Sequence, residues 1–214
     1  MKTEPGRFIR DNTSVMAPPH VPEIRLHLAD EAHDLWLKTE DELEAIGLPP
    51  PFWAFAWAGG QGLARHVLDH PDLVAGKRVL DFASGSGLVA IAAKKAGAAQ
   101  VAAVDIDPWT MTAIELNSRL NDVDLNVASA DLIGSALDMD ILLAGDVFYD
   151  KAFADRLVPW FAALASTGVT VIVGDPGRAY CPRNRMTALA TYEVPVTRVL
   201  EDAEVKRTTV WRFD

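Results

Sequence analysis

The chain has 214 residues, half of them apolar, and its 20 basic and 30 acidic residues give a formal net charge of -10. This length suits one domain with a well-buried core, and the negative charge gives no general attraction to the phosphate backbone of nucleic acids. No stretch approaches the roughly 18 uncharged residues of a membrane helix, the N-terminus lacks an export signal, and a single cysteine, Cys181, excludes an internal disulfide and a cysteine-cluster zinc site. We therefore expect a soluble protein of a reducing compartment, by default the cytoplasm, that binds neither nucleic acid nor a membrane.

The first 70 residues contain few regular elements. Residues 1–22 mix proline, asparagine, serine and charges without sustained periodicity, which predicts a flexible lead-in. Residues 23–28 alternate between polar and apolar side chains, which is typical of a half-buried strand. Asp30 is suited to cap a helix that runs to Ile46, and a second helix is expected at 62–69, after the aromatic segment PFWAFAWAGGQG.

From residue 78 onward, apolar strands and amphipathic helices alternate, as they do in a parallel sheet that is covered on both faces. The predicted strands are 78–82, 101–105, 125–130, 140–145 and 169–174, and the predicted helices are 87–97, 108–120 and 151–166. Two further strands, 192–200 and 208–213, are joined by a link too short for a helical crossover and predict an antiparallel pair. The prediction is an α/β fold in which residues 23–214 form one domain around a Rossmann-like sheet of seven strands, closed by this hairpin.

Residues 78–97, RVLDFASGSGLVAIAAKKAG, predict a strand that enters a helix through a glycine turn. Such a turn leaves free backbone N–H groups at a helix N-terminus, where they suit an anionic group. Gly85, Gly87 and Ala90 also fit the G-x-G-x-x-G/A pattern of dinucleotide-binding proteins, so a dehydrogenase is one alternative. However, Asp81 ends the strand, where an anion would repel a pyrophosphate and attract an ammonium group. The acid and the turn together suit the two ends of an amino acid.

Two further acids stand at predicted strand ends. Asp105 ends the second strand of the sheet, where a carboxylate can accept both hydroxyl groups of a ribose. Asp131 follows the third strand, where a side chain can reach the exocyclic amine of adenine. An amino acid, a ribose and an adenine, bound in this order, indicate S-adenosylmethionine as the cofactor.

The segment DFASGSG at 81–87 is similar to the first motif of the seven-strand methyltransferases, roughly D-x-G-x-G-x-G. Ala83 replaces the first glycine, which is tolerable if this position keeps a negative φ. The segments PEIRLHL, PFWA, WAGGQ, DIDP, GDVFYD and GDPGR resemble those of the lysine methyltransferases that modify the electron transfer flavoprotein β subunit. The resemblance implies methylation of lysine side chains in a folded protein, with that subunit as the first substrate to test.

The resemblance and the chemistry together predict the residues of the site. Methyl transfer from a sulfonium needs no metal, and the five histidines lack metal-ligand spacing. Asp146 is the candidate that positions the lysine and takes part in its proton loss, with Tyr149 beside it. Phe148 and Tyr149 are expected to line the lysine channel, with core packing as the alternative for Phe148. Asp175 and Arg178 lie on a loop where Arg178 can grip an acidic group of the substrate or, alternatively, face solvent. The predicted cofactor-binding residues are Trp57, Gly60, Asp81, Ala83, Ser84, Gly85, Gly87, Asp105, Ile106, Asp131, Gly145 and Asp146.

Three other functions remain open at this point. The nearest is a small-molecule N- or O-methyltransferase, which would share the fold and the cofactor. A nicotinamide-dependent oxidoreductase is disfavoured by Asp81 and by the lack of a second domain for substrate. A catalytically silent protein that binds the cofactor as a partner module is disfavoured by the presence of Asp81, Asp105 and Asp146.

Overall fold

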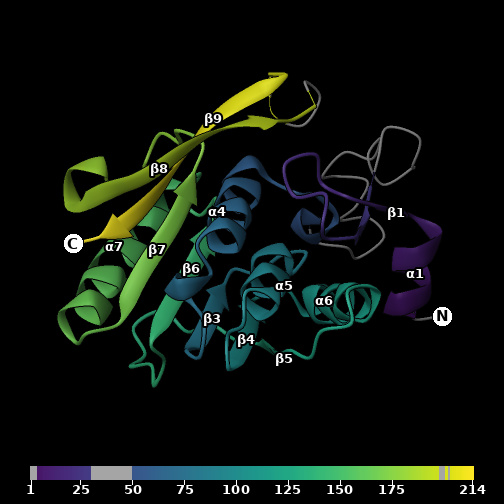
Figure 1. Cartoon of the computed structure of the whole chain (residues 1–214), viewed down its shortest axis with the longest axis horizontal. Coiled ribbons are helices and arrows are strands. Elements are labelled where there is room, and N and C mark those ends of the chain that lie inside the picture. Colours follow the sequence, from purple (N-terminus) through teal and green to yellow (C-terminus); the bar gives the residue numbers. More distant parts are fainter. Residues whose placement is uncertain (1–3, 30–49, 198–200, 202) are drawn as a thin grey trace.

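The computed structural model describes residues 4–29, 50–197, 201 and 203–214. Its main sheet has seven strands in the order β5-β4-β3-β6-β7-β9-β8 (Figure 1). The strand bounds are Arg78–Phe82 for β3, Gln100–Asp105 for β4, Asn126–Ser129 for β5, Ile141–Gly145 for β6, Thr170–Asp175 for β7, Met186–Pro195 for β8 and Val205–Phe213 for β9. β3 to β7 pair in parallel, and β9 inserts antiparallel between β7 and β8. The predicted α/β fold with a C-terminal antiparallel hairpin is confirmed.

The strand order reverses at β3, because β4 and β5 extend the sheet to one side and β6 and β7 extend it to the other. In open sheets of this kind, a crevice forms outside the carboxyl ends of the strands at the reversal point. Asp81 lies on β3, Asp105 ends β4 and Asp146 follows β6, so the fold brings these three predicted site residues to one edge.

The main helices are α4 at Ala58–Asp69, α5 at Leu88–Lys95, α6 at Pro108–Leu120 and α7 at Lys151–Ser166. The predicted bounds of α6 and α7 are confirmed, because each helix begins at a clear capping aspartate. The carboxylate of Asp107 accepts the Trp109 N–H at 2.9 Å, and that of Asp150 accepts the Phe153 N–H at 2.8 Å. α4 begins four residues earlier than predicted, since glycine-rich sequence is a poor local helix signal that packing overrides here.

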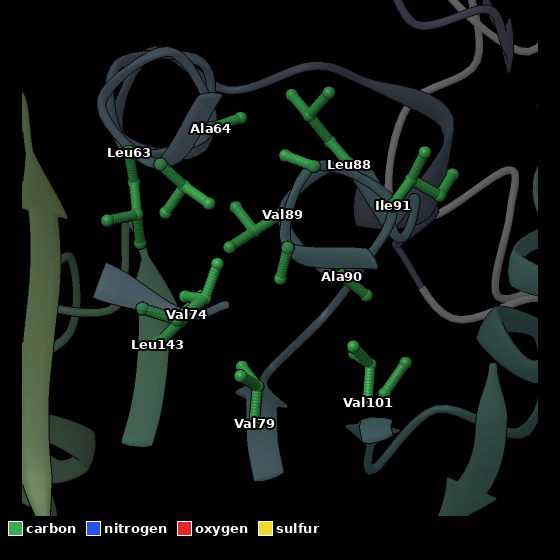
Figure 2. Close-up of a cluster of buried hydrophobic side chains, with 14 of the residues drawn as sticks. Leu63, Ala64, Val74, Val79, Leu88, Val89, Ala90, Ile91, Val101 and Leu143 are labelled. Atoms are coloured by element: carbon green, nitrogen blue, oxygen red, sulfur yellow. The ribbon is translucent and has the colours of Figure 1, made fainter. Parts of the chain in front are cut away.

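Alternate strand residues face the two sides of the sheet, and each side has its own apolar core. Val79 and Leu143 pack under α4 and α5, whereas Leu80 and Leu142 pack against α7. Figure 2 shows the first core, in which side chains of α4 and α5 such as Leu63 and Val89 point toward the strand residues Val79, Val101 and Leu143. Helices on both faces of the sheet, as predicted, therefore hold the strand ends in place.

The start of α4 lies directly on the ends of β6 and β7, backbone against backbone. A Cβ atom built on Gly59 would lie 2.5 Å from the Gly174 oxygen, and one built on Gly174 would lie 2.1 Å from the Gly59 oxygen. A Cβ atom on Gly145 would lie 2.7 Å from the Gly60 Cα. These contacts leave no room for a side chain at Gly59, Gly145 or Gly174, and they fix the N-terminus of α4 at the crevice.

The N-terminal segment differs from the prediction of an irregular lead-in at residues 1–22. Helix α1 spans Pro5–Asp11 and is capped by Glu4, and strand β1 at Ser14–Met16 pairs antiparallel with β2 at Leu26–Leu28. These elements are too short to produce a periodic sequence, and they are held by packing against the domain. The Phe8 ring, for example, contacts the Trp109 ring of α6 at a centroid distance of 5.4 Å.

Asn117 of α6 and Asn121, the C-cap residue of the same helix, bind the chain around β2. The Asn117 Oδ1 accepts the His27 N–H at 2.7 Å, while its Nδ2 donates to the Ser86 carbonyl in the glycine turn at 2.8 Å. Asn121 accepts from the Arg25 N–H at 3.0 Å and donates to the Arg25 carbonyl at 2.6 Å. All three residues of β2 are buried, so the predicted half-buried strand at 23–28 is shorter and more enclosed than its alternation indicates.

The remaining differences lie at the ends of elements. β8 begins at Met186, before the predicted start at 192, and the prediction fails because its exposed residues 187–189 show no clear alternation of polar and apolar side chains. The helix predicted at 30–46 and residues 198–200 of a predicted strand lie outside the described residues. Short 3-10 helices occupy Phe52–Ala54 (η1), Pro71–Leu73 (η2) and Arg183–Arg185 (η3). Within the described ranges, no helix has the length and apolar character needed to cross a bilayer.

Candidate active site

Two adjoining cavities open at the carboxyl ends of β3, β4 and β6. Their volumes are about 520 and 50 Å³, and Trp57, Ala83, Gly85 and Gly145 line both. The larger cavity is also lined by the predicted residues Asp105, Ile106, Asp131, Asp146, Tyr149 and Arg178, and the smaller one by Gly60, Asp81 and Ser84. The structure thus brings most of the predicted site residues around one divided pocket.

Asp81 is a buried acid at the wall of the smaller cavity, and the residue is only 1% exposed. Its Oδ2 accepts the Ser84 hydroxyl at 2.5 Å and the Ala90 N–H at 2.9 Å. Burial nevertheless raises the pKa of this carboxyl group to about 7, because the two hydrogen bonds offset the loss of solvent only in part. A cationic group in the smaller cavity would complete the stabilisation of the carboxylate.

The glycine turn, residues 83–87, corrects one expectation from the sequence. Ala83 has a φ of 53°, in the left-handed region, and Gly85 and Gly87 have φ values of 51° and 80°. The first position of the motif therefore needs the conformation that glycine adopts freely, and the condition under which alanine is tolerable there, a negative φ, is not met. For a residue with a Cβ atom this conformation costs about 1–2 kcal/mol. Gly87 lines neither cavity but forms the N-cap of α5, where it closes the turn.

Asp105 holds the turn from the neighbouring strand. Its Oδ2 accepts the Gly85 N–H at 2.9 Å, and its Oδ1 accepts the Asp107 N–H at 3.1 Å. Each oxygen keeps a further lone pair, and the residue lines the larger cavity. Ile106 beside it is 71% exposed and offers an apolar surface at the same wall.

Asp131 is more constrained than the sequence predicts. Its Oδ2 forms an ion pair with the Arg156 Nη2 at 2.7 Å, and its Oδ1 accepts the Ile133 N–H at 3.1 Å. The arginine lowers the pKa of this exposed carboxyl group. Asp131 and Arg156 both line the larger cavity, so a ligand at this wall meets an ion pair in place of a free carboxylate. Arg156 lies on α7, and no motif of the sequence predicted its role at this wall.

The opposite wall is built around Asp146, which is 7% exposed and has a φ of 62°. Its Oδ1 accepts from the Arg178 Nε at 2.5 Å, and its Oδ2 accepts from the Arg178 Nη2 and the Gly59 N–H, both at 3.1 Å. Its own N–H donates to the Gly174 carbonyl at 2.8 Å. Asp146 is therefore fixed by its left-handed backbone, by the start of α4 and by a bidentate arginine.

Arg178 also reaches a second acid. Its Nη2 lies 3.1 and 3.3 Å from the two carboxylate oxygens of Glu201, whose Oε1 accepts the Ala58 N–H at 3.3 Å. We call Asp146, Arg178 and Glu201 the acid–arginine cluster. The guanidinium group is thus engaged within the protein, in contrast to the predicted grip on a substrate acid and to a solvent-facing side chain. Glu201 was missed, because nothing in the charged link EDAEVKR distinguishes it from its neighbours.

The two aromatic residues that were predicted to line the lysine channel, Tyr149 and Phe148, lie in different surroundings. Tyr149 is 52% exposed, lines the larger cavity, and packs near the Phe52 and Phe153 rings at centroid distances of 5.9 and 6.0 Å. Phe148 is fully buried against Phe161 in the core under α7, so its prediction as a channel residue is wrong. Side chains that follow a strand can point to either side, and only the backbone path decides between them.

Asp175 is also buried, with 2% exposure, and does not reach the surface as a substrate contact would require. Its Oδ1 accepts the Gly177 and Arg178 N–H groups at 2.7 and 2.9 Å. It therefore shapes the loop that carries Arg178. Burial raises the pKa of this carboxyl group.

Comparisons with known proteins identify the family of this chain. The chain is 39% identical to the electron transfer flavoprotein beta subunit lysine methyltransferase of Danio rerio, over 97% of this chain and 82% of the relative. It is 36% identical to the protein of the same name from Homo sapiens, over 96% of this chain and 80% of the relative. The chain belongs to this lysine methyltransferase family. The family resemblance seen in the sequence is confirmed.

Shorter and more distant matches of this lysine methyltransferase family member agree on the fold. Residues 66–148 match the family described as ribosomal protein L11 methyltransferase (PrmA). The magnesium protoporphyrin IX methyltransferase from Synechocystis PCC 6803, solved with bound SAM, superposes with a TM-score of 0.56 at 15% identity, over 87% of this chain and all of that chain. The ribosomal protein L11 methylase from Lactobacillus delbrueckii subsp. bulgaricus gives a TM-score of 0.52 at 23% identity, over 75% and 80% of the two chains.

Proposed function

We propose that this protein is an S-adenosylmethionine-dependent lysine N-methyltransferase that acts on the electron transfer flavoprotein β subunit. The observation that carries the proposal is the divided pocket, which has a buried acid in its smaller part and two acids at opposite walls of its larger part. The names of the relatives support the choice of substrate. We further propose that the reaction takes place in a reducing compartment such as the cytoplasm and uses no metal ion.

The residues of the pocket fit S-adenosylmethionine. Asp81 would face the ammonium group, the amides of the glycine turn would face the carboxylate, and Asp105 would accept the ribose hydroxyl groups. The remaining neighbours are Trp57 and Gly60 at the methionine end, and Ile106 and Asp131 at the adenine end. The demethylated product, S-adenosylhomocysteine, would use the same contacts. When bound, the cofactor supplies an activated methyl group on a sulfonium.

The chain itself has to align the acceptor amine, exclude water and obtain that amine in its neutral form. With an ordinary lysine pKa near 10.4, deprotonation at neutral pH costs about 4 kcal/mol. Asp146 has one lone pair of Oδ1 left after its contacts to Arg178 and Gly59, and this lone pair would accept an N–H of the incoming lysine. Asp146 thus holds the amine and takes part in its proton loss.

An aromatic wall would guide the lysine side chain to Asp146. Tyr149 lies at this wall between Phe52 and Phe153, and its half-exposed ring offers a face to a cation. A cation over such a face gains about 0.5–2 kcal/mol. Removing only the hydroxyl group, in Tyr149→Phe, should therefore be milder than removing the ring, in Tyr149→Ala.

The test combines the purified electron transfer flavoprotein β subunit with this protein and S-adenosylmethionine. Intact-mass analysis should show multiples of a methyl group added on lysine. The Asp146→Asn variant keeps the shape and removes the charge, so turnover should drop on the order of 100-fold or more. Its affinity for S-adenosylhomocysteine, measured by calorimetry, should change little. An unmodified β subunit, together with efficient methylation of a small amine, would show that the enzyme acts on small molecules instead.

A further inference from the structure

The acid–arginine cluster holds more acids than one arginine can neutralise. The side chains of Asp146 and Glu201 are 5% and 0% exposed, and Arg178 lies between them at 23% exposure. Asp175 adds a third buried carboxyl group, whose Oδ2 has no hydrogen-bond partner. Arg178 is further held by the Trp57 ring, whose centroid lies 6.0 Å from its guanidinium carbon.

Only part of this cluster faces the larger cavity. Asp146 and Arg178 line it, whereas Glu201 is not part of its wall. A lysine that reaches Asp146 therefore meets a carboxylate already paired with a guanidinium group. Glu201 contacts this guanidinium group without lining the cavity. Glu201 cannot touch the lysine, so any effect on the reaction has to pass through Arg178 or through the start of α4.

We propose that Arg178 and Glu201 set the protonation state of the substrate lysine at Asp146. This inference rests on the proposed function. Arg178 cancels most of the negative charge of Asp146, so the site accepts the lysine as a neutral amine in preference to an ammonium ion. Glu201 is a positioning residue that holds Arg178 against Asp146. Its own negative charge also offsets part of the positive charge of Arg178, which limits the cancellation at Asp146.

The physical basis is the field at the amine nitrogen. A lone carboxylate beside an ammonium group stabilises the charged form and raises its pKa by about 1–3 units, whereas a paired carboxylate does so much less. The other titratable groups that act on the cluster are Asp175 at the end of β7, Tyr149 after β6 and Lys206 on β9, and Tyr149 is itself close to Asp105 and Asp150. These groups stay in place when Arg178 or Glu201 is exchanged, so the two exchanges isolate the effect of the cluster.

The two substitutions should shift the pH dependence in opposite directions. Arg178→Gln leaves the acids uncompensated and favours the ammonium form, so the midpoint of the kcat–pH profile should move up by about one unit. At neutral pH, kcat should then fall about tenfold while KM also falls. Glu201→Gln keeps hydrogen-bond acceptors for Arg178 and Ala58 but removes a negative charge. Its midpoint should move to lower pH, and its KM should rise.

The experiment measures kcat and KM for the β subunit across pH for the parental protein and for Arg178→Gln, Glu201→Gln and Arg178→Lys. Arg178→Lys keeps the charge and should return the midpoint close to the parental value, even if its rate is lower. Calorimetry with S-adenosylhomocysteine and melting curves show whether each variant is folded. Binding of the β subunit as a function of pH, measured in the presence of S-adenosylhomocysteine, should follow the same opposite shifts.

The outcomes separate the two proposals. If the parental protein methylates the β subunit but the Arg178→Gln and Glu201→Gln midpoints stay together or move in the same direction, the cluster is only structural and the inference fails. If Arg178→Gln does not fold, Glu201→Gln and Arg178→Lys decide alone, and an unshifted Glu201→Gln midpoint overturns the inference. If the parental protein leaves the β subunit unmethylated at every pH, the proposed function fails and the inference falls with it.

Discussion

The two walls of the pocket are held by contacts that differ greatly in the separation of their partners along the chain. In the glycine turn, the carboxylate of Asp81 is bound by groups three and nine residues away, and the Gly85 N–H is bound by an acid 20 residues away. In the acid–arginine cluster, the contacts of Asp146 span 32 and 87 residues, and that of Glu201 to α4 spans 143. The first wall is largely a local structure, and the second exists only when the whole sheet is assembled.

This difference predicts how each wall fails. Damage to the glycine turn should weaken cofactor binding while the rest of the domain stays folded. Damage to the contacts between α4 and the ends of β6 and β7 should instead disturb the domain as a whole, because the acids of the second wall cap the α4 N-terminus.

The largest effect is expected for Gly59→Ala, which breaks the second wall. Its methyl group would lie 2.5 Å from the Gly174 oxygen and 2.7 Å from the Asp146 nitrogen, both backbone atoms that cannot move aside easily. The free energy of unfolding should fall by about 3 kcal/mol or more, as measured by urea denaturation.

Gly60→Ala is the matched control, since a Cβ atom at Gly60 meets nothing within 4 Å. It should leave stability unchanged or raise it by about 0.5–1 kcal/mol, because alanine favours a helix. The methyl group would enter the smaller cavity, however, and should lower the affinity for S-adenosylhomocysteine. Equal stability losses in the two variants would contradict the backbone contact as the cause.

Asp105→Ala breaks the first wall. The substitution removes the hydrogen bond to Gly85 and the two acceptors that we propose for the ribose, so the affinity for S-adenosylhomocysteine should fall by about 1–3 kcal/mol in calorimetry. The melting temperature should change much less than in Gly59→Ala. Asp124→Ala, at an exposed residue away from both cavities, serves as the control and should bind normally.

The ionisation of Asp81 in the first wall should make the stability of the protein depend on pH. Burial raises the pKa of this acid to about 7 in the folded protein, above the ordinary value near 3.9. The protonated form therefore favours folding, so its contribution to stability is fully present below about pH 4 and is lost as pH rises to about 7. The ligand-free protein should show this loss relative to Asp81→Asn.

Cofactor binding should show the opposite trend, because the ammonium group needs the ionised acid. Affinity for S-adenosylhomocysteine should fall by about tenfold for each pH unit below 7. In Asp81→Asn this dependence should disappear. A parental affinity that stays constant between about pH 5 and 8 would show that Asp81 does not meet the ammonium group.

The smallest effect is expected for Ala83→Gly. It relieves the left-handed conformation at a φ of 53°, and the greater freedom of glycine in the unfolded chain offsets part of the gain. The free energy of unfolding should rise by up to about 1 kcal/mol. Ala96→Gly, at a residue with a φ of -77°, should lower it by a similar amount. A loss of stability in both variants would show that Ala83 is not strained.

The sequence predicts well those features whose causes lie within a few residues. The bounds of α6 and α7 follow from the capping acids Asp107 and Asp150. The strand-end positions of Asp81 and Asp105 follow from apolar runs that a buried parallel sheet requires. These features sufficed to predict the fold and the place of the pocket from the residues alone.

Other features depend on the path of the chain in space. Arg178 meets Asp146 because the two residues follow the adjacent parallel strands β7 and β6, and it meets Glu201 because β9 inserts next to β7 and Glu201 lies just before β9. No local pattern contains this information, so Arg178 was expected to act on the substrate. Phe148 was misplaced for the same reason, and the conformation of Ala83 was misjudged because alanine by itself favours a negative φ.

Asn117 gives the N-terminal segment an influence on the pocket that its distance along the chain would not suggest. One end of this amide binds the His27 backbone in β2, and the other binds Ser86 in the glycine turn. A shortened protein that starts at residue 50 would retain every strand of the main sheet and every residue of both cavities. It would still leave the Asn117 oxygen without its partner and expose the part of the core that Ile24 and Leu26 cover. Efforts to trim this enzyme to a minimal catalytic fragment should therefore stop before α1 and β1.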